Sequence, residues 1–228
     1  MSAVTLSTLV ARVRDKADMP TAGFVADSGT GLYSYINEGV QLLHDKLCRA
    51  YAEDYMEKPS AFTYTSGDVS LPADFYKLLG VDLLQNGTTV TLSAYTRRER
   101  NALSNTSLLG YGGAPRYKLT SVGGIAGTGA IRLLPAPASG TTGTVWYIPT
   151  PPVLTVVGDT VNFPGGWERY VVTYAAIQCL LKEESDVNDL RVELSRMDAE
   201  LNDIIENRDA GEPKHSGDVD NLNDSIYW

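Results

Sequence analysis

The sequence predicts an α+β fold: a four-helix module drawn from both chain ends, with an inserted antiparallel β-rich subdomain between them. Two apolar seams carry this prediction, because residues repeated every three or four positions share one face of a helix. The seam near the end of the sequence is Val187, Leu190, Leu194, Met197, Leu201 and Ile204. The seam near its beginning is Leu32, Ile36, Val40, Leu43 and Leu47. The stretch between them has short apolar runs and Gly/Pro turns, which are typical of β-structure.

This pattern divides the chain into three parts. Residues 1–55 and 164–208 are expected to form the helical bundle module, residues 56–163 the β-rich insertion, and residues 209–228 an extended C-terminal arm. The helices are expected near residues 5–19, 28–52, 167–184 and 186–208. A chain of 228 residues can bury one good core together with a smaller satellite.

The first two helices also have signals at their ends. Pro20 ends the first helix, because proline cannot continue one. Ser28 is expected to be the N-cap of the second, where its hydroxyl would accept a backbone N–H. Gly39 costs the second helix about 1 kcal/mol relative to alanine. We interpret it as the mark of a close helix–helix approach.

The insertion is expected to consist of antiparallel hairpins, because the links between its apolar runs are short. Asn86-Gly87, between runs at 76–84 and 88–92, is the strongest hairpin signal in the chain. Further strands are expected at 61–64, 69–71, 116–120, 130–134, 145–148 and near Val161.

The last two helices differ in character. The third follows Gly165-Gly166 and is apolar almost all round, so it is expected to be the most buried helix. The fourth keeps a polar face. Ser185 is expected to cap it, with Asp186 and Asp189 favourable near its N-terminus.

The composition is that of a globular protein with an acidic surface. The formal net charge is −9, so nonspecific nucleic-acid binding is not expected. Cys48 and Cys179 fall in predicted helices, where a free thiol behaves as a small hydrophobic group. The N-terminus lacks the apolar run of a secretory signal, and no run reaches the roughly 20 residues of a membrane helix. The chain is therefore expected to be made in the cytoplasm and to have no membrane partner.

The residue patterns do not indicate an active site. Gly123-Gly124 is better explained as a hairpin turn than as a phosphate-binding loop, because the lysine and hydroxyl of a P-loop are missing. His44 is expected to be a surface or packing residue, and His215 to belong to a solvated arm. We therefore expect no enzyme, no catalytic residue, no cofactor and no metal.

Two features suggest docking to other proteins. Arg97, Arg98 and Arg100 are a basic cluster in an acidic chain, either a docking patch for an acidic neighbouring subunit or a solvated helix face. The last twenty residues carry five acidic side chains against Lys214 and finish with Ile226-Tyr227-Trp228. Large apolar anchors of this kind suit a segment that folds onto a partner. The alternative is that Trp228 packs on the chain's own core.

An ordered series of short motifs resembles the head-to-tail adaptor proteins of tailed bacteriophages, which sit below the portal. The motifs cover nearly the whole chain, and the long β-rich insertion is similar to the tail-tubular kind found in short-tailed phages. They are Tyr35-Ile36-Asn37-Glu38-Gly39, Leu71-Pro72-Ala73-Asp74-Phe75-Tyr76, Leu134-Pro135-Ala136-Pro137, Tyr147-Ile148-Pro149 with Pro151, Trp167-Glu168 with Ala175-Ala176, and Lys182-Glu183-Glu184-Ser185-Asp186.

The resemblance implies a homo-oligomeric ring, by family habit of twelve copies, on the portal protein in the virion neck. Such a ring lengthens the channel through which double-stranded DNA passes without specific binding, and it carries the downstream tail or nozzle protein. It implies no cofactor and no catalytic residue. The expected portal or partner docking residues are Asp218, Asp220, Ile226, Tyr227 and Trp228. The expected inter-subunit docking residues are Arg97, Arg98 and Arg100.

Three other functions stay open at this point. A minor tail or tube component would never contact the portal. A hydrolase acting on the cell wall would need a cleft with convergent titratable groups. A carbohydrate-binding module could stack sugars on aromatic side chains, although strand alternation favours core packing for at least half of them. The candidates are Tyr111, Tyr117, Trp146 and Tyr147.

Overall fold

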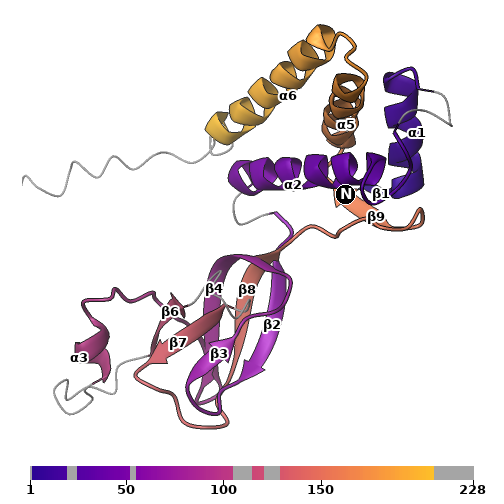
Figure 1. The fold of residues 1–228 in the computed structure, drawn as a ribbon. Coiled ribbons are helices and arrows are strands. Elements are labelled where there is room, and N and C mark those ends of the chain that lie inside the picture. The colour runs from indigo at the N-terminus through magenta and orange to yellow at the C-terminus, as the bar shows by residue number, and fades with distance from the viewer. Residues whose placement is uncertain (1, 20–24, 52–54, 105–114, 121–128, 208–228) are drawn as a thin grey trace, which may run out of the picture. The chain divides into compact units, whose positions relative to one another are not determined.

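The structure is a computed structural model that describes residues 2–19, 25–51, 55–104, 115–120 and 129–207. Helices and antiparallel sheets form the predicted α+β fold (Figure 1). The chain divides into two compact units. One unit, called the helical unit, consists of Met1–Ala52 and Val153–Trp228, and the other, called the β unit, consists of Glu53–Pro152.

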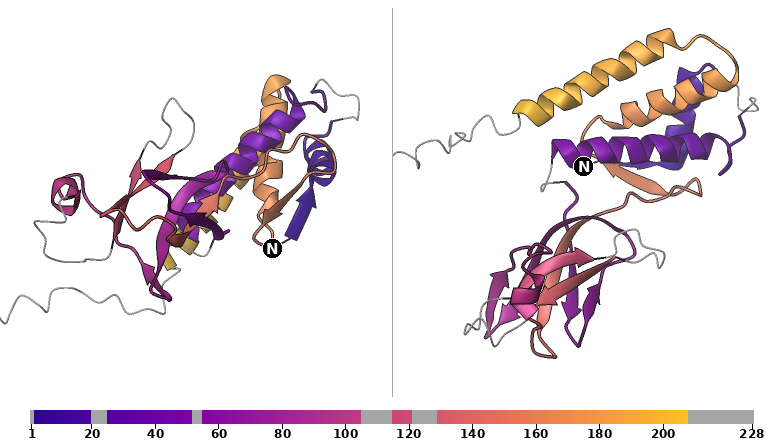
Figure 2. Two further views of the ribbon diagram at one scale, coloured as in Figure 1. Left: turned by 90° about the horizontal axis from the view of Figure 1, so that it is seen from below. Right: turned by 60° about the vertical axis from the view of Figure 1, so that its left-hand side comes forward.

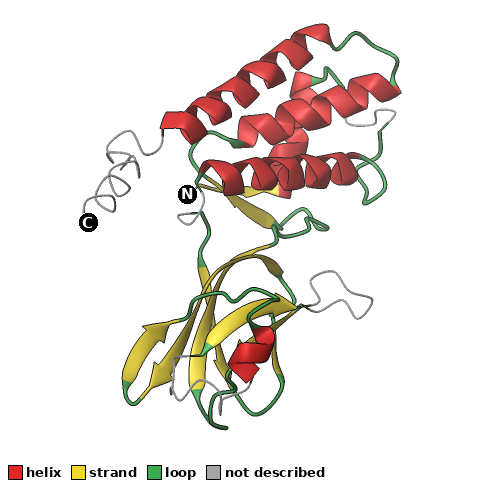
Figure 3. Cartoon of the chain, turned by 90° about the vertical axis from the view of Figure 1, so that its left-hand side faces the viewer, coloured by secondary structure: helices red, strands yellow, loops and turns green. Residues whose placement is uncertain are grey.

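Helix α5 is the centre of the helical unit, because the three other long helices pack against it (Figure 3). These elements are α1 (Leu6–Lys16), α2 (Leu32–Ala50), α5 (Glu168–Lys182) and α6 (Asn188–Asn207). The sequence of α5 is apolar almost all round, and its buried side chains accordingly face several neighbours. They are Tyr170, Val171, Val172, Thr173, Ala175, Ala176, Ile177 and Cys179. The prediction that this helix is deeply buried is confirmed.

Both predicted apolar seams face the interior of the helical unit. All five seam residues of α2 are at most 2% exposed. In the second seam, Val187, which directly precedes α6, is buried together with Met197 and Leu201 of that helix. The other seam residues are half-buried, because α6 covers only one side of the core. Burying one such side chain contributes about 1.5–3 kcal/mol. The seams therefore supply much of the energy that holds this unit together.

Gly39 lies where α2 approaches α5. A Cβ atom at this position would lie 3.1 Å from Cδ1 of Tyr174 and 3.3 Å from Cγ1 of Val171. Those distances are tighter than ordinary van der Waals contact, so a larger residue would push the helices apart. The interpretation of Gly39 as a close-approach residue is confirmed.

A two-stranded antiparallel sheet closes the helical unit. Strand β1 (Ser2–Thr5) pairs with β9 (Thr160–Phe163), and Val161 and Phe163 point into the core. The strand expected near Val161 is present, but it pairs within the helical unit, whereas the sequence placed it in the β-rich insertion. Strand β1 was not predicted, because its four residues have no clear alternation and its partner is distant in the chain, with Ser2 opposite Phe163.

Two predicted helix caps are wrong. Helix α2 begins at Leu32 with Gly31 as its N-cap and no side-chain cap, while the Ser28 carbonyl accepts the N–H of Gly31 at 3.0 Å. At α6, which begins at Asn188, the Asp186 carboxylate accepts the Asn188 N–H at 3.0 Å. Ser28 and Ser185 are both able to cap, but in each case the turn that precedes the helix ends later than expected.

The β unit contains two antiparallel sheets (Figure 2). The four-stranded sheet has the order β2 (Lys58–Thr63), β8 (Thr142–Pro149), β4 (Phe75–Gln85) and β5 (Thr88–Thr91). The three-stranded sheet has the order β3 (Asp68–Ser70), β7 (Ala130–Leu134) and β6 (Arg116–Thr120). The short helix α3 (Arg100–Ser104) precedes β6 and touches β7.

The predicted hairpin at Asn86-Gly87 is confirmed. Gln85 pairs with Thr88, so the loop has two residues, and Asn86 and Gly87 have φ values of 51° and 79°. Positive φ at both central positions matches the twist of the flanking strands, which is why this dipeptide is favoured there.

The core of the β unit contains apolar residues from both sheets. Val81, Leu83 and Val145 come from the four-stranded sheet, and Ile131 and Leu133 from the three-stranded sheet. Because side chains alternate along a strand, Arg132, which lies between Ile131 and Leu133, is directed to the outer face. The inner face thus builds the core and the outer face is left for charged residues.

Candidate functional site

One hollow on the described surface is lined mainly by positively charged side chains. It has a volume of about 240 Å³ and lies on the outer face of the three-stranded sheet of the β unit. We call it the basic hollow; its lining residues are Tyr95, Arg97, Arg100, Lys118, Leu119, Thr120 and Arg132. Two larger hollows, one over Gly143 and one beside α1, have mostly uncharged linings. Charge therefore singles out the basic hollow.

Strand register places three charged residues in one row. Asp68 of β3 stands opposite Arg132 of β7, and Arg132 stands opposite Lys118 of β6. Residues directly opposite in an antiparallel sheet have Cβ atoms about 4.5–5.5 Å apart, so these side chains interact. The row runs acid, base, base across the sheet, and the second base has no acid next to it in the row.

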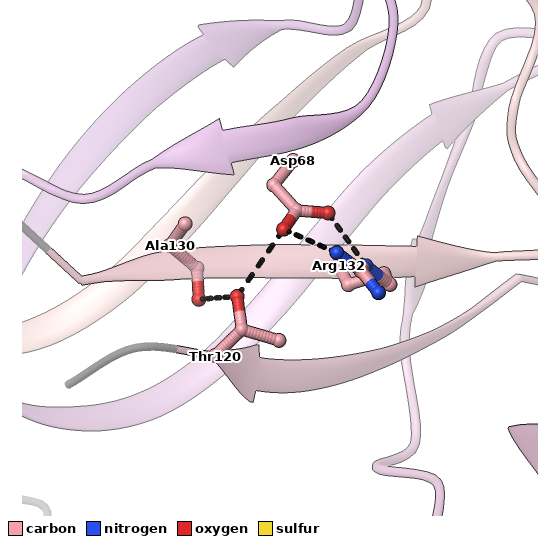
Figure 4. A network of polar contacts seen from close by, with 4 residues as sticks. All are labelled: Asp68, Thr120, Ala130 and Arg132. Atoms are coloured by element: carbon pink, nitrogen blue, oxygen red, sulfur yellow. Dashed lines mark hydrogen bonds and ion pairs between the residues drawn. The ribbon is translucent and has the colours of Figure 1, made fainter. Parts of the chain in front are cut away.

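Asp68 and Arg132 form a two-pronged ion pair (Figure 4). Nε of Arg132 donates to Oδ1 of Asp68 at 2.7 Å, and Nη2 donates to Oδ2 at 2.9 Å. The Thr120 hydroxyl lies 3.1 Å from the Ala130 carbonyl oxygen and 3.4 Å from Asp68. The hydrogen bonds from Arg132 lower the pKa of Asp68, and Asp68 in turn raises the pKa of Arg132. Both groups are therefore charged at neutral pH, and the guanidinium plane is held in one orientation.

Lys118 lies over an aromatic ring instead of beside a carboxylate. Its Nζ is 5.9 Å from the ring centroid of Tyr95, a distance at which an ammonium group is attracted to the ring face. Tyr95 is buried, and its backbone N–H donates to the backbone carbonyl of Tyr117 at 2.9 Å. Burial raises the pKa of its phenol. The ring thus forms a neutral apolar part of the hollow.

Arg97 enters the hollow from a tight turn, and Arg100 enters it from the first position of α3, directly after that turn. Glu99 closes this turn by accepting the Thr96 N–H at 2.7 Å and the Thr96 hydroxyl at 2.9 Å. The first of these bonds is the main reason that the pKa of Glu99 is lowered. Glu99 also pairs with Arg116 at 3.2 Å. Glu99 therefore stabilises the turn and pairs with Arg116, which does not line the hollow.

The structure brings together part of the predicted arginine cluster. Arg97 and Arg100 line the basic hollow, whereas Arg98 is exposed but does not line it. Helix α3 begins at Arg100, so Arg97 and Arg98 lie in the turn before it and do not share a helix face with Arg100. The predicted arm residues Asp218, Asp220, Ile226, Tyr227 and Trp228 lie outside the described residues.

Lys118 and Arg132 were missed by sequence reasoning, because they come from strands well separated from the cluster. One signal could have found them. Between Arg100 and Asp159 the sequence has no acidic residue, although the whole chain has 28. Every charged side chain in that stretch is basic, so any face that its strands share is positive.

The remaining candidate residues have structural roles. His44 and both cysteines are buried, as a packing interpretation requires; burial lowers the pKa of His44 and raises the pKa of Cys179 to about 11. Tyr147 is buried with its hydroxyl donating to Asp74 at 2.8 Å, and the indole N–H of Trp146 donates to Asp82 at 2.7 Å. Tyr111 lies outside the described residues.

Within the described ranges, no group of three His, Cys, Asp or Glu side chains could hold a metal ion. No helix in this part of the chain is both long and apolar enough to cross a membrane.

The fold is that of an α+β protein with two compact units, one of which carries a basic hollow. Comparison with protein families gives a more specific answer: residues 4–218 match the SU10 adaptor protein model, so the chain belongs to the SU10 adaptor protein family. The resemblance to phage head-to-tail adaptors is thereby confirmed, and the chain is a phage adaptor protein. None of the curated proteins compared with it matches the chain.

Proposed function

We propose that the chain is a structural head-to-tail adaptor subunit. In this proposal it forms a ring, of twelve copies by the habit of such adaptors, beneath the phage portal in the virion neck after synthesis in the host cytoplasm. The ring extends the channel through which double-stranded DNA passes without specific binding. It also provides the platform to which the downstream tail or nozzle protein attaches, and it performs no catalysis and needs no cofactor.

The observation that carries this proposal is the family match over residues 4–218, which includes both units. The division into two units supports it. The helical unit is joined by contacts between residues far apart in sequence, such as Lys46 with Asp198 at 2.6 Å. A subunit with such a scaffold can bear load while its β unit contacts other proteins.

We also propose that the subunit is fixed only when it reaches its partners. The acidic arm, with Asp218, Asp220, Ile226, Tyr227 and Trp228, docks on the portal or on a neighbouring subunit. Arg97, Arg98 and Arg100 contribute to docking between subunits. The isolated chain, with its net charge of −9, is largely monomeric in dilute solution because like charges repel. Stable rings in dilute solution would contradict this part of the proposal.

Co-sedimentation with purified portal rings of the same phage tests the proposal. The full chain is compared with a chain that ends at Arg208, which keeps all the described elements. Binding of the full chain alone supports an adaptor whose anchor is the arm, and binding of both supports an adaptor anchored by its helices. If neither sediments with the portal, the proposal fails and a tail component without portal contact becomes the better interpretation.

A further inference from the structure

The basic hollow carries more positive charge than the fold needs. Of its four cations, Arg132 is paired with Asp68, whereas Arg97, Arg100 and Lys118 have no carboxylate within ion-pair distance among the described residues. Lys118 also stands directly opposite Arg132. A like-charge pair at opposite positions destabilises a sheet, and a negatively charged ligand between the two would remove that cost.

We propose that the basic hollow binds the acidic C-terminal arm, residues 209–228, of a neighbouring copy of the same chain. This inference rests on the proposed function, in which copies lie side by side. The first support is charge complementarity. The arm carries five acidic residues and one lysine, whereas the hollow presents three cations that no described carboxylate pairs. Complementary charges of this kind steer partners and fix their register.

The size and lining of the hollow suit side chains of a peptide. Small-molecule sites usually have about 300–1,000 Å³, and this hollow is smaller, at about 240 Å³. Tyr95 and Leu119 add an apolar part to the basic lining. The arm offers carboxylates together with Tyr227 and Trp228. Guanidinium groups pair with carboxylates and also stack on aromatic faces, so one site can hold both kinds of residue.

Nucleic acid matches the same surface less well. Phosphate backbones are bound by extended basic faces, and their affinity comes from the number of phosphates neutralised. Here the positive charge is confined to four side chains in one hollow, and one of them, Arg132, is already paired with Asp68 at 2.7 Å. So few cations neutralise few phosphates. A concave site with an apolar part also fits a side chain better than a duplex.

The arm can reach a second copy. It follows α6, which ends at Asn207, and residues 208–228 would span at most about 70 Å when fully extended. A few charge pairs at an open surface give modest affinity. A ring on the portal would hold arms and hollows at high effective concentration. Association is therefore expected at high protein concentration and is negligible in dilute solution.

Mixing two full-length variants tests the inference. The hollow variant carries Arg97→Glu and Lys118→Glu, and the arm variant carries Asp218→Lys and Asp220→Lys. Lys77→Glu is the control, because Lys77 is an exposed cation of the same unit that does not line the hollow and has no proposed docking role. Sedimentation velocity is measured up to several hundred micromolar at low salt, where charge pairs are least screened. Circular dichroism checks that each variant is folded.

The parent and the Lys77→Glu chain are expected to associate, and each of the two variants alone to associate at least about tenfold more weakly. The equimolar mixture is expected to form a dimer that grows no further, because it contains one intact hollow and one intact arm. Variants that associate like the parent, a mixture that stays monomeric, or a parent that never associates would each overturn the inference. If the hollow variant fails to fold, Arg97→Gln with Arg100→Gln replaces it.

Two further measurements distinguish the hollow–arm contact from nucleic-acid binding and from portal binding. If the hollow variant loses affinity for duplex DNA and the arm variant does not, while neither change alters self-association, the surface binds nucleic acid and the inference is wrong. Portal co-sedimentation is read independently. If the dimer forms as expected but no chain sediments with the portal, the hollow–arm contact stands and the adaptor proposal fails.

Discussion

The core of the helical unit is built around one helix, whereas the core of the β unit is built between two sheets. Helix α5 is buried on most of its surface and packs against α1, α2 and α6. In the described part of the β unit, the core has no such central element, and one face of each sheet packs against the other sheet. One face of every strand pair therefore remains available for charged side chains.

Polar contacts differ between the units in the same way. In the helical unit, charged residues join helices that are distant in sequence, as Lys16 joins Glu193 at 2.6 Å and Thr173 at 2.8 Å. In the β unit, Arg132 pairs with Asp68 on the outer face of the three-stranded sheet, and three more cations line the same hollow without a described carboxylate partner. The comparison teaches that ion pairs join separate helices in the helical unit, whereas in the β unit unpaired positive charge gathers in one hollow.

The largest effect is expected from truncating the α2 seam. Leu43→Ala should lower the free energy of unfolding of the helical unit by about 2–5 kcal/mol, because Leu43 is 0% exposed and its removal leaves a cavity. Urea unfolding followed by helical circular dichroism measures this. The neighbouring Leu42→Ala is the control: Leu42 is 38% exposed, so its truncation should change stability by about 0.5 kcal/mol or less. Equal losses would show that α2 is not packed as described.

A smaller loss of stability is expected when the hydroxyl group of Tyr147 is removed from the β unit. Tyr147→Phe keeps the buried ring but removes the hydrogen bond to Asp74, which should cost about 0.5–1.5 kcal/mol. Hydrogen exchange along β8 would report the loss, and exchange in the helical unit should stay unchanged if the units are independent. Tyr117→Phe is the comparison, because the half-buried Tyr117 has no described hydroxyl bond. A loss of similar size in both variants would contradict the assignment to Asp74.

The smallest loss of stability is expected when the pH is lowered. Arg132 holds the pKa of Asp68 below its ordinary value of 3.8, and Lys58 does the same for Asp74. A lowered pKa means that the ionised form is favoured by folding. The stability it adds is present above pH 3.8 and is lost as the pH falls through the folded value. The β unit should therefore weaken on acidification.

Asp68→Asn isolates one part of this effect. The variant should be less stable than the parent at pH 7, and the difference should shrink as the pH falls through the folded pKa of Asp68, because the parent then loses the same ion pair. Hydrogen exchange in β3 and β7 over that range measures the difference. Glu57→Gln, at an exposed position of the same unit, is the control and should be as stable as the parent at pH 7. A constant gap between Asp68→Asn and the parent would show that the carboxylate charge is not what stabilises the pair.

Sequence patterns predicted best the features that are set by residues close together in the chain. The seams of α2 and α6 and the hairpin at Asn86-Gly87 depend on residues close in the chain, and all three are present. Strand β1 escaped prediction because its partner β9 is distant. The helix caps failed because Ser28 and Ser185 can both cap, and only the length of the preceding turn decides whether they do.

The candidate site was predicted in part for the same reason. Arg97 and Arg100 are neighbours in sequence, so their clustering is visible directly. Lys118 and Arg132 join them only through the register of β6 and β7, which no local pattern reveals. The pairing of Asp68 with Arg132, which leaves Lys118 without an acid in its row, depends on three strands at once.

The pairing of β1 with β9 sets an order of folding during synthesis. The β unit is the continuous segment Glu53–Pro152, so all of it can emerge from the ribosome and fold before its surroundings are complete. Helices α1 and α2 must wait for β9 and α5, and at about 5–20 residues per second that wait lasts roughly 5–20 s. Limited proteolysis of chains arrested near residue 150 should cut within α1 and α2 but spare the β unit. During this interval the apolar seam of α2 has not yet met α5, the helix that covers it in the folded unit.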